Sequence, residues 1–217
     1  MHNGFFKRAA LAFALLTVGF DAGAITISAV PNTQTVNAGD AVSVDILISD
    51  LAPGSPPPGG APSLSEFDID LNFDSGVLSI DTTDSNRDAV IDSVTLDPAG
   101  QMDLSGLGLN VVFAGLTAPN TLNLFNLSLD LPADLDLLQS SSFILASIHF
   151  TASSSGTSLL GISINTLGDS LGLALTARIQ GGSVTVAGGP SPVPIPSPFW
   201  LLLPGLAGIV VHRMRTG

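Results

Sequence analysis

Apolar and polar residues alternate with a period of two through the middle of the chain. Residues 41–49 (AVSVDILIS) place Val42, Val44, Ile46 and Ile48 on one side. Residues 66–74 (EFDIDLNFD) alternate apolar side chains with acidic residues and asparagine. This pattern is typical of β-strands that bury one face and expose the other. Further short strands are predicted at residues 143–152, 158–165 and 182–188.

Less regular stretches lie between these strands. Residues 121–131 (TLNLFNLSLDL) alternate as well, but their phase slips between Leu124 and Phe125, which predicts a β-bulge. Residues 131–139 are expected to form no more than two helical turns, and the Pro/Gly-rich residues 52–63 and the acidic residues 81–97 are expected to be loops. Many short antiparallel strands in one domain predict an all-β jelly roll or β-sandwich.

The first 24 residues have the layout of a secretory signal peptide. Lys7 and Arg8 precede the apolar run Ala9–Phe20, and Ala22-Gly23-Ala24 is a small-x-small cleavage site. We therefore expect removal after Ala24. The alternative is an uncleaved membrane anchor.

The last 28 residues, 190–217, combine a Pro-rich stretch, an apolar run and a basic end. Val193–Val211 carries no charge and would form roughly 28 Å of helix at about 1.5 Å per residue, close to the thickness of a bilayer core. Arg213 and Arg215 would then remain on the cytoplasmic side. We expect a single transmembrane helix. The alternative is a buried C-terminal helix of the globular domain.

These two ends together resemble the PEP-CTERM class of exported bacterial proteins. The matching motif is Val193-Pro194-Ile195-Pro196, followed by the apolar helix and the stub with Arg213 and Arg215. The usual motif of that class has Glu where this chain has Ile195. The resemblance implies a sorting tail that an exosortase, a membrane-embedded protease-transpeptidase, processes. It also implies a Gram-negative host that makes exopolysaccharide.

Composition restricts the chemistry of the central residues 25–189, which have the size of one domain. Cysteine is absent, which excludes disulfides, thiol nucleophiles and thiolate metal sites. Seventeen acidic residues stand against only two basic ones, Arg87 and Arg178. Such a surface repels nucleic acids, so no nucleic-acid partner is expected. High solubility is an equally good reading of this charge.

The central residues resemble cohesin domains. Gly39-Asp40 with the following strand, and Phe67–Asp74 followed by Val77-Leu78, match early strands of that family. Residues 145–152 and 182–186 match its late strands. The resemblance implies a cohesin-like jelly-roll β-sandwich. Family cohesins bind dockerin modules, but these motifs carry over no dockerin-contact residue.

One acidic segment has the spacing of a calcium-binding loop. Asp84, Asn86, Asp88 and Asp92 stand where such loops place oxygen ligands, so calcium is the one candidate cofactor. Glycine is expected at the sixth position, where the chain has Ala89, and Glu at the twelfth, where it has Thr95. The alternative is an ordinary solvated turn of Asp and Asn residues.

No set of residues predicts an enzyme. Asp68, Asp70 and Asp74 share one strand, and paired carboxylates can hydrolyse glycosides, but such carboxylates more often belong to a strand face that is simply polar. His149 is the sole histidine of the central region and is expected to be exposed, with no nucleophile motif beside it. No catalytic residue is therefore assigned.

The sequence as a whole predicts a non-enzymatic module of the cell envelope or extracellular matrix. Its expected partners are the exosortase-like enzyme, the membrane, and either matrix polysaccharide or another envelope protein. The first alternative is a carbohydrate-binding accessory protein, although the only tryptophan, Trp200, lies in the tail and tyrosine is absent. The second alternative is a carboxylate-based hydrolase.

Overall fold

The computed structural model describes residues 24–52 and 63–188. The predicted signal peptide up to residue 23, most of the Pro/Gly-rich loop and the sorting tail from residue 189 lie outside these ranges. Ala22, the motif Val193–Pro196, Arg213 and Arg215 are therefore predictions that remain untested. Within the described ranges, no helix is both long and apolar enough to cross a membrane.

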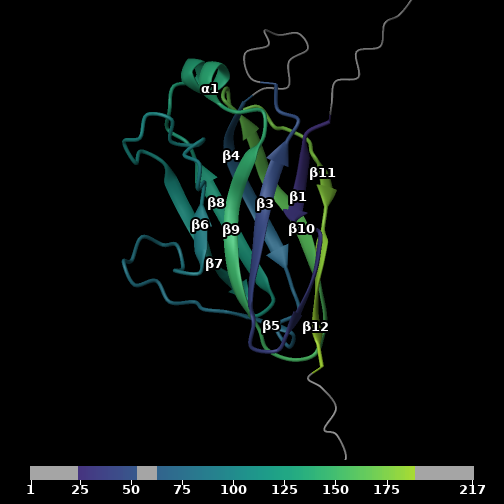
Figure 1. Ribbon diagram of the computed structural model, residues 1–217. Coiled ribbons are helices and arrows are strands. Elements are labelled where there is room, and N and C mark those ends of the chain that lie inside the picture. Colours follow the sequence, from purple (N-terminus) through teal and green to yellow (C-terminus); the bar gives the residue numbers. More distant parts are fainter. Residues whose placement is uncertain (1–23, 53–62, 189–217) are drawn as a thin grey trace, which may run out of the picture.

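Twelve strands and one short helix make up the described residues (Figure 1). Their bounds are β1 (Thr26–Val30), β2 (Thr33–Asn37), β3 (Ala41–Ser49), β4 (Leu64–Asn72), β5 (Leu78–Ile80), β6 (Val94–Leu96), β7 (Val111–Ala118), β8 (Thr121–Leu127), α1 (Pro132–Leu138), β9 (Phe143–Ala152), β10 (Gly156–Asp169), β11 (Arg178–Gln180) and β12 (Gly182–Ala187).

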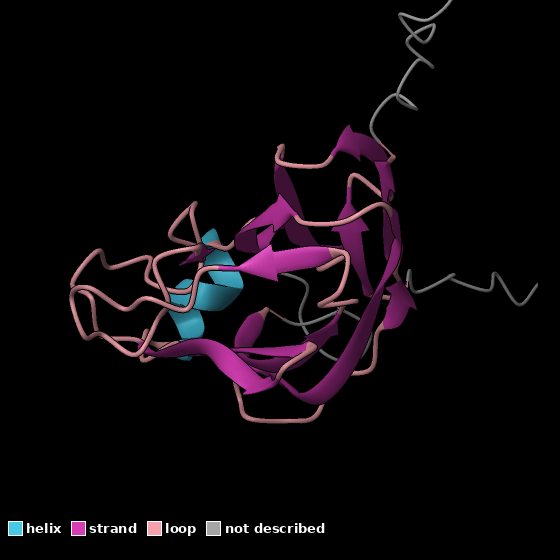
Figure 2. Ribbon diagram, turned by 90° about the horizontal axis from the view of Figure 1, so that it is seen from below, coloured by secondary structure: helices cyan, strands magenta, loops and turns pink. Residues whose placement is uncertain are grey.

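The strands form two sheets that pack face to face. The first sheet has the order β11-β1-β3-β9-β5, with β6 also paired to β9. The second sheet has the order β2-β12-β10-β4-β8-β7. Figure 2 shows the strands enclosing the interior, while long loops project on one side of the sandwich together with α1. The predicted all-β sandwich is confirmed.

The alternating residues of β3 and β4 form the centre of the core. Val44, Ile46 and Ile48 of β3 are fully buried, and so are Phe67 and the other inward-facing apolar residues of β4. Side chains of successive strand residues point to opposite faces, so these residues face one another between the sheets. Burying apolar surface contributes roughly 25 cal/mol per Å², which makes this interior the main source of stability.

The structure corrects the predicted bulge in β8. Pairing between β8 and β4 runs without interruption from Thr121 to Leu127. The apparent slip arises because Asn126 occupies a fully buried position, whereas Phe125 and Leu127 face outward and are half-buried. A polar residue inside and apolar residues outside imitate a change of phase.

Two further predictions concern short elements. The segment 81–97 is not entirely a loop, because its last residues form β6 against β9. The short helix predicted within residues 131–139 is confirmed as α1, and only Leu135 of this helix is buried.

At both ends of the domain the chain passes from the first sheet to the second, and these two crossings lie next to each other. β1 pairs in parallel with β11 in the first sheet, and β2 pairs in parallel with β12 in the second. The crossing is tight: a Cβ at Gly181 would lie 2.5 Å from the carbonyl oxygen of Leu160, and one at Gly182 would lie 2.9 Å from that of Asn32. Glycine is therefore required where the chain passes between the sheets.

Candidate functional site

Most of the candidate functional residues lie on the outer face of the second sheet. Three rows of residues cross it from β4 through β8 to β7. One row joins Asp68, Phe125 and Phe113. The neighbouring rows join Asp70 to Asn123 and Gly115, and Glu66 to Leu127 and Val111. The face is therefore acidic along β4 and apolar along β7 and β8.

Apolar side chains are exposed on β7 and in the loop that leads into it, where Leu107 and Leu109 precede the strand. Leu107, Leu109, Val111 and Phe113 follow each other at every second position, and all four are exposed. The ring of Phe113 lies over Gly115, where an added Cβ would come within 3.0 Å of the ring. We call these four residues the apolar stripe. Single exposed apolar residues are ordinary, whereas a contiguous row of them marks an interaction site.

The acidic half is held in place by amide side chains. The Nδ2 of Asn123 donates hydrogen bonds to Oδ1 of Asp68 (2.6 Å) and to Oδ1 of Asp70 (2.9 Å). The Nδ2 of Asn165 on β10 also donates to Oδ1 of Asp68 (3.1 Å). One amide group thus bridges two carboxylates and fixes their positions. Asp74, the third carboxylate predicted on this strand, follows the end of β4 and does not join them.

The predicted calcium loop is a compact turn built around Asp84. Its Oδ1 accepts hydrogen bonds from the backbone N–H groups of Arg87 (2.6 Å) and Asp88 (3.3 Å), and its Oδ2 accepts one from Ala89 (3.2 Å). Ala89 has a φ of 69°, so the backbone makes the left-handed turn for which glycine was expected. A left-handed alanine costs roughly 1–2 kcal/mol.

The other candidate ligands also make hydrogen bonds within this turn. Asn86 donates from Nδ2 to Oδ2 of Asp88 (2.8 Å), and Oδ1 of Asp92 accepts from both the N–H and the hydroxyl of Ser85 (3.1 Å each). Asn86 and Asp88 thus bond to one another, whereas Asp84 and Asp92 bond to other groups of the same turn. Among the described residues no group of three or more His, Cys, Asp or Glu is arranged to hold a metal ion. Calcium binding stays a prediction.

The same loop reaches the edge of the second sheet. The carbonyl oxygen of Ala89 accepts a hydrogen bond from the N–H of Ala114 (3.0 Å), and the N–H of Ile91 donates to the carbonyl oxygen of Ala114 (3.1 Å). Ala114 lies in the middle of β7, which ends the sheet on this side. The loop therefore covers the centre of an edge strand that would otherwise invite pairing with other chains.

Two aspartates outside the second sheet have shifted pKa values of opposite sign. Asp97 is buried, and burial raises its pKa, although the backbone N–H groups of Met102 (2.6 Å) and Gln101 (2.8 Å) donate to its carboxylate. The exposed Asp81 accepts hydrogen bonds from the side chain and the backbone of Thr83, and these lower its pKa.

The residues weighed for catalysis do not converge. Asp68 and Asp70 lie on the outer face of the second sheet. His149 is exposed, as predicted, and pairs with Ser43 on the first sheet. The core of the sandwich separates the two outer faces. His149 therefore cannot act together with the carboxylate pair.

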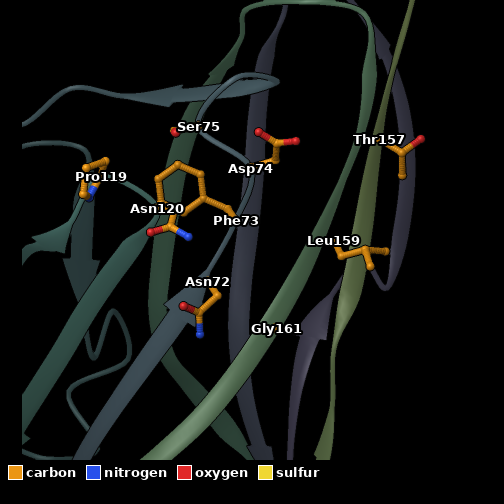
Figure 3. Close-up of a pocket in the computed structure, with 9 residues that line it drawn as sticks. All are labelled: Asn72, Phe73, Asp74, Ser75, Pro119, Asn120, Thr157, Leu159 and Gly161. Carbon is orange, nitrogen blue, oxygen red and sulfur yellow. The ribbon is translucent and has the colours of Figure 1, made fainter.

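A hollow of about 600 Å³ lies at one end of the same outer face, where β4 stops (Figure 3). In that view, the Asp74 side chain lies between the Asn72 and Asn120 amides on one side and Leu159 and Thr157 on the other. Its nine lining residues are Asn72, Phe73, Asp74, Ser75, Pro119, Asn120, Thr157, Leu159 and Gly161.

Sequence reasoning missed the apolar stripe. Two features of the sequence point to it: the alternation of Leu107, Leu109, Val111 and Phe113, and the change of phase after Leu124. From sequence alone, alternating apolar residues are predicted to be buried in the core. Only the structure shows that the row faces outward.

No family model matches the sequence, and no curated protein is significantly similar to it. Solved structures do match. A type II cohesin domain from the cellulosome of Acetivibrio cellulolyticus aligns with a TM-score of 0.51 at 15% identity, covering 74% of this chain and 95% of that one. A non-cellulosomal cohesin from the archaeon Archaeoglobus fulgidus gives 0.50 at 12% identity, covering 76% and 92%.

A third match is a type I cohesin–dockerin complex from Clostridium thermocellum, with a TM-score of 0.51 at 13% identity, covering 75% of this chain and 93% of that one. Identities this low establish similarity of fold alone. The central domain has a cohesin-like fold.

Proposed function

We propose that the chain is a non-enzymatic protein-binding module that uses the outer face of the second sheet. The apolar stripe beside the carboxylates of Asp68 and Asp70 carries this proposal. Protein interfaces combine an apolar centre with a polar rim, and aromatic residues near the centre contribute most of the binding energy. Phe113 and Phe125 supply such a centre, and the β4 carboxylates supply the rim.

The charge of the face specifies the chemistry of the partner. The acidic row is fixed by amide hydrogen bonds, and the two arginines of the central domain lie elsewhere, in the acidic loop and in β11. A partner that presents Lys or Arg beside apolar side chains would complement both halves. Complementary charge mainly accelerates association and selects among partners. The match to a cohesin–dockerin complex supports binding of a protein, although it does not identify which protein.

The proposed location rests on the sequence. The signal peptide 1–24 would direct export, and the tail 190–217 would hold the protein in the inner membrane until an exosortase-like enzyme acts on the motif Val193–Pro196. The mature module would then belong to the envelope or the extracellular matrix. The matched type II cohesin domain of Acetivibrio cellulolyticus is described as part of a cellulosome, which is compatible with a role outside the cell.

Catalysis has no part in this proposal. Asp68 and Asp70 lie on an open sheet face and share the amide of Asn123, so neither is enclosed with a substrate. Low-dielectric enclosure is what tunes catalytic carboxylates.

The decisive experiment compares two faces of one protein. Purified full-length protein and a Val111→Asp/Phe113→Asp variant are immobilised and exposed to native envelope extract, with Thr151→Asp as the matched control. Thr151 is an exposed residue of β9 on the opposite outer face. We expect a protein that the wild type and the control enrich and the stripe variant does not. Direct titration with that protein, once purified, must reproduce the difference. Equal enrichment by all three proteins would refute this binding face.

A further inference from the structure

The hollow at the end of β4 is wide open to solvent, and its size and lining suit a small ligand bound at the surface. Its volume of about 600 Å³ falls within the usual range for ligand pockets, roughly 300–1,000 Å³. It lies beyond the apolar stripe and shares no residue with it. The inference drawn from it is therefore independent of the proposed protein-binding face.

The lining side chains indicate what kind of molecule would fit. Asn72 and Asn120 offer amides, Ser75 and Thr157 offer hydroxyls, and Asp74 offers a carboxylate. Amides and hydroxyls both donate and accept hydrogen bonds, whereas a carboxylate only accepts them. None of the nine lining residues is cationic, so an anionic ligand would be repelled. A neutral molecule with many hydroxyl groups satisfies this set.

An apolar patch completes the site. Leu159 is 73% exposed at the rim of the hollow, and Pro119 lies across from it (Figure 3). The ring of Phe73 is not available for stacking, because it is buried and packs against Phe150 with ring centroids 5.0 Å apart. The C–H face of a sugar ring would contact Leu159. Without an aromatic platform, binding should be weak.

Two of the polar residues, Asn72 and Asp74, are held in place before any ligand arrives. Oδ1 of Asn72 accepts a hydrogen bond from the hydroxyl of Thr121 (2.9 Å), and Oδ1 of Asp74 accepts one from the N–H of Gly76 (2.8 Å). The N–H of Asp74 donates to the hydroxyl of the fully buried Ser158 (2.9 Å). Preorganised groups lose little conformational freedom on binding.

Gly161 keeps the hollow open. It lies on β10 beside Asn72, and a Cβ added there would meet the Cβ of Asn72 at 3.8 Å, an ordinary contact. A larger side chain would therefore occupy the hollow without a backbone clash. This makes position 161 a means of filling the site while keeping the fold.

We propose that this hollow binds one residue of a neutral carbohydrate, with the Asp74 carboxylate and the Asn72 and Asn120 amides bound to its hydroxyl groups. The sequence-based alternative of a carbohydrate-binding accessory protein thereby gains a specific site. The ligand class follows from the lining chemistry, and the weak affinity follows from the missing aromatic platform.

The test is a titration followed by nuclear magnetic resonance. The ¹⁵N-labelled full-length protein is titrated separately with D-glucose, D-galactose, D-mannose and N-acetyl-D-glucosamine, up to tens of millimolar. We expect at least one sugar to give saturable shifts of the side-chain amide signals of Asn72 and Asn120. Shifts that stay linear for all four sugars, or that spare these two amides, would overturn the proposal.

Variants locate the site. Gly161→Val, which fills the hollow, and Asp74→Ala, which removes the carboxylate, should each weaken binding at least tenfold. Ser43→Val adds the same side chain at an exposed position of β3 and should leave binding unchanged. Leu159→Ala, which alters a side chain already in solvent, should weaken binding severalfold even if another variant folds poorly. Unchanged affinity in Leu159→Ala and Gly161→Val would refute the site.

Discussion

The two sheets of the sandwich treat their outer faces differently. The first sheet presents mostly polar residues along β3 and β9, such as Ser43, His149 and Thr151, although a register shift between Ile46 and Leu47 interrupts its alternation. Ser147 of this sheet donates a hydrogen bond to Asp45 (2.7 Å). The second sheet breaks alternation in both directions. Apolar residues such as Phe113 face solvent, and polar Asn126 lies inside with no exposure.

This difference indicates which face has a role beyond folding. A sheet needs an apolar inner face and tolerates any polar outer face, so the polar outward residues of β3 and β9 satisfy folding alone. Exposing the apolar stripe gains no folding stability and creates a risk of aggregation. Local rules are broken mainly where function demands it. The second sheet is therefore the more informative half of the molecule.

The largest expected effect on binding comes from replacing an exposed apolar residue of the second sheet with a polar residue of the kind found on the first sheet. Phe113→Thr should weaken binding of the partner captured by the wild-type protein by about 2 kcal/mol or more, at least roughly thirtyfold, because a central aromatic contact is lost. Isothermal titration calorimetry measures the affinity. Phe113 is already partly exposed, so the thermal midpoint should change little. An affinity within twofold of wild type would contradict a binding role for the outer face of the second sheet.

The buried amide of Asn126 offers a test inside the same sheet. Its Nδ2 has no hydrogen-bond partner among the described residues, and its Oδ1 accepts one long bond from Asn110 (3.4 Å). Asn126→Val should therefore raise the free energy of unfolding by about 1 kcal/mol in urea titrations. The same change at the neighbouring Asn123 should lower it, because Asn123 bridges two carboxylates. Two changes of equal sign would contradict this account.

A smaller effect is expected from charge. Asp68→Asn/Asp70→Asn should slow association with a cationic partner severalfold and flatten its dependence on salt, with little change in dissociation. Asp45→Asn on the first sheet should do neither. Stopped-flow measurements at two ionic strengths separate the two rates. Equal effects from both faces would mean that net charge, rather than the acidic row, attracts the partner.

The two shifted aspartates should give pH dependences of opposite sign. Burial raises the pKa of Asp97, so its contribution to stability is present below the ordinary value of 3.8 and is lost as pH rises through the raised value. The pKa of Asp81 is lowered by Thr83, so its contribution is present above 3.8 and is lost as pH falls through the lowered value.

Asp97→Asn and Asp81→Asn isolate these contributions. Unfolding free energies of each variant relative to wild type, measured between acidic and neutral pH, should slope in opposite directions. Parallel slopes would show that another group governs the acid response.

Calcium binding predicts the smallest effect, and general screening of charge by salt would produce a similar one. Calcium should raise the thermal midpoint more than sodium chloride of the same ionic strength does, because binding to the native state alone stabilises it. Asp84→Ala/Asp88→Ala should abolish that excess. Each protein serves as its own reference, since losing Asp84 also removes the bonds that shape the turn. Equal responses of the wild type to both salts would show that this segment is an ordinary solvated turn that does not bind calcium.

The sequence predicted what local pattern determines. Alternation located β3, β4, β9 and much of β10, and the dominance of strands predicted the sandwich. It did not predict β7 or β11, because one carries apolar residues outward and the other is three exposed residues held by pairing with β1. The spacing of Asp84, Asn86, Asp88 and Asp92 located one turn. The hollow escaped prediction, because Asn72, Asn120 and Thr157 meet only after β4, β8 and β10 have paired.

The parallel pairing of the first and last strands has a consequence for the order of folding. Among the described residues β2 pairs only with β12, so its pairing depends on residues about 150 positions later in the chain. Contacts so distant in sequence must overcome a large loss of chain entropy before they add stability, and they slow folding. A chain that emerges from a ribosome or a membrane channel with its N-terminus first cannot complete the second sheet until Ala187 has emerged. β2, one of the first strands in the chain, is therefore among the last to find its partner.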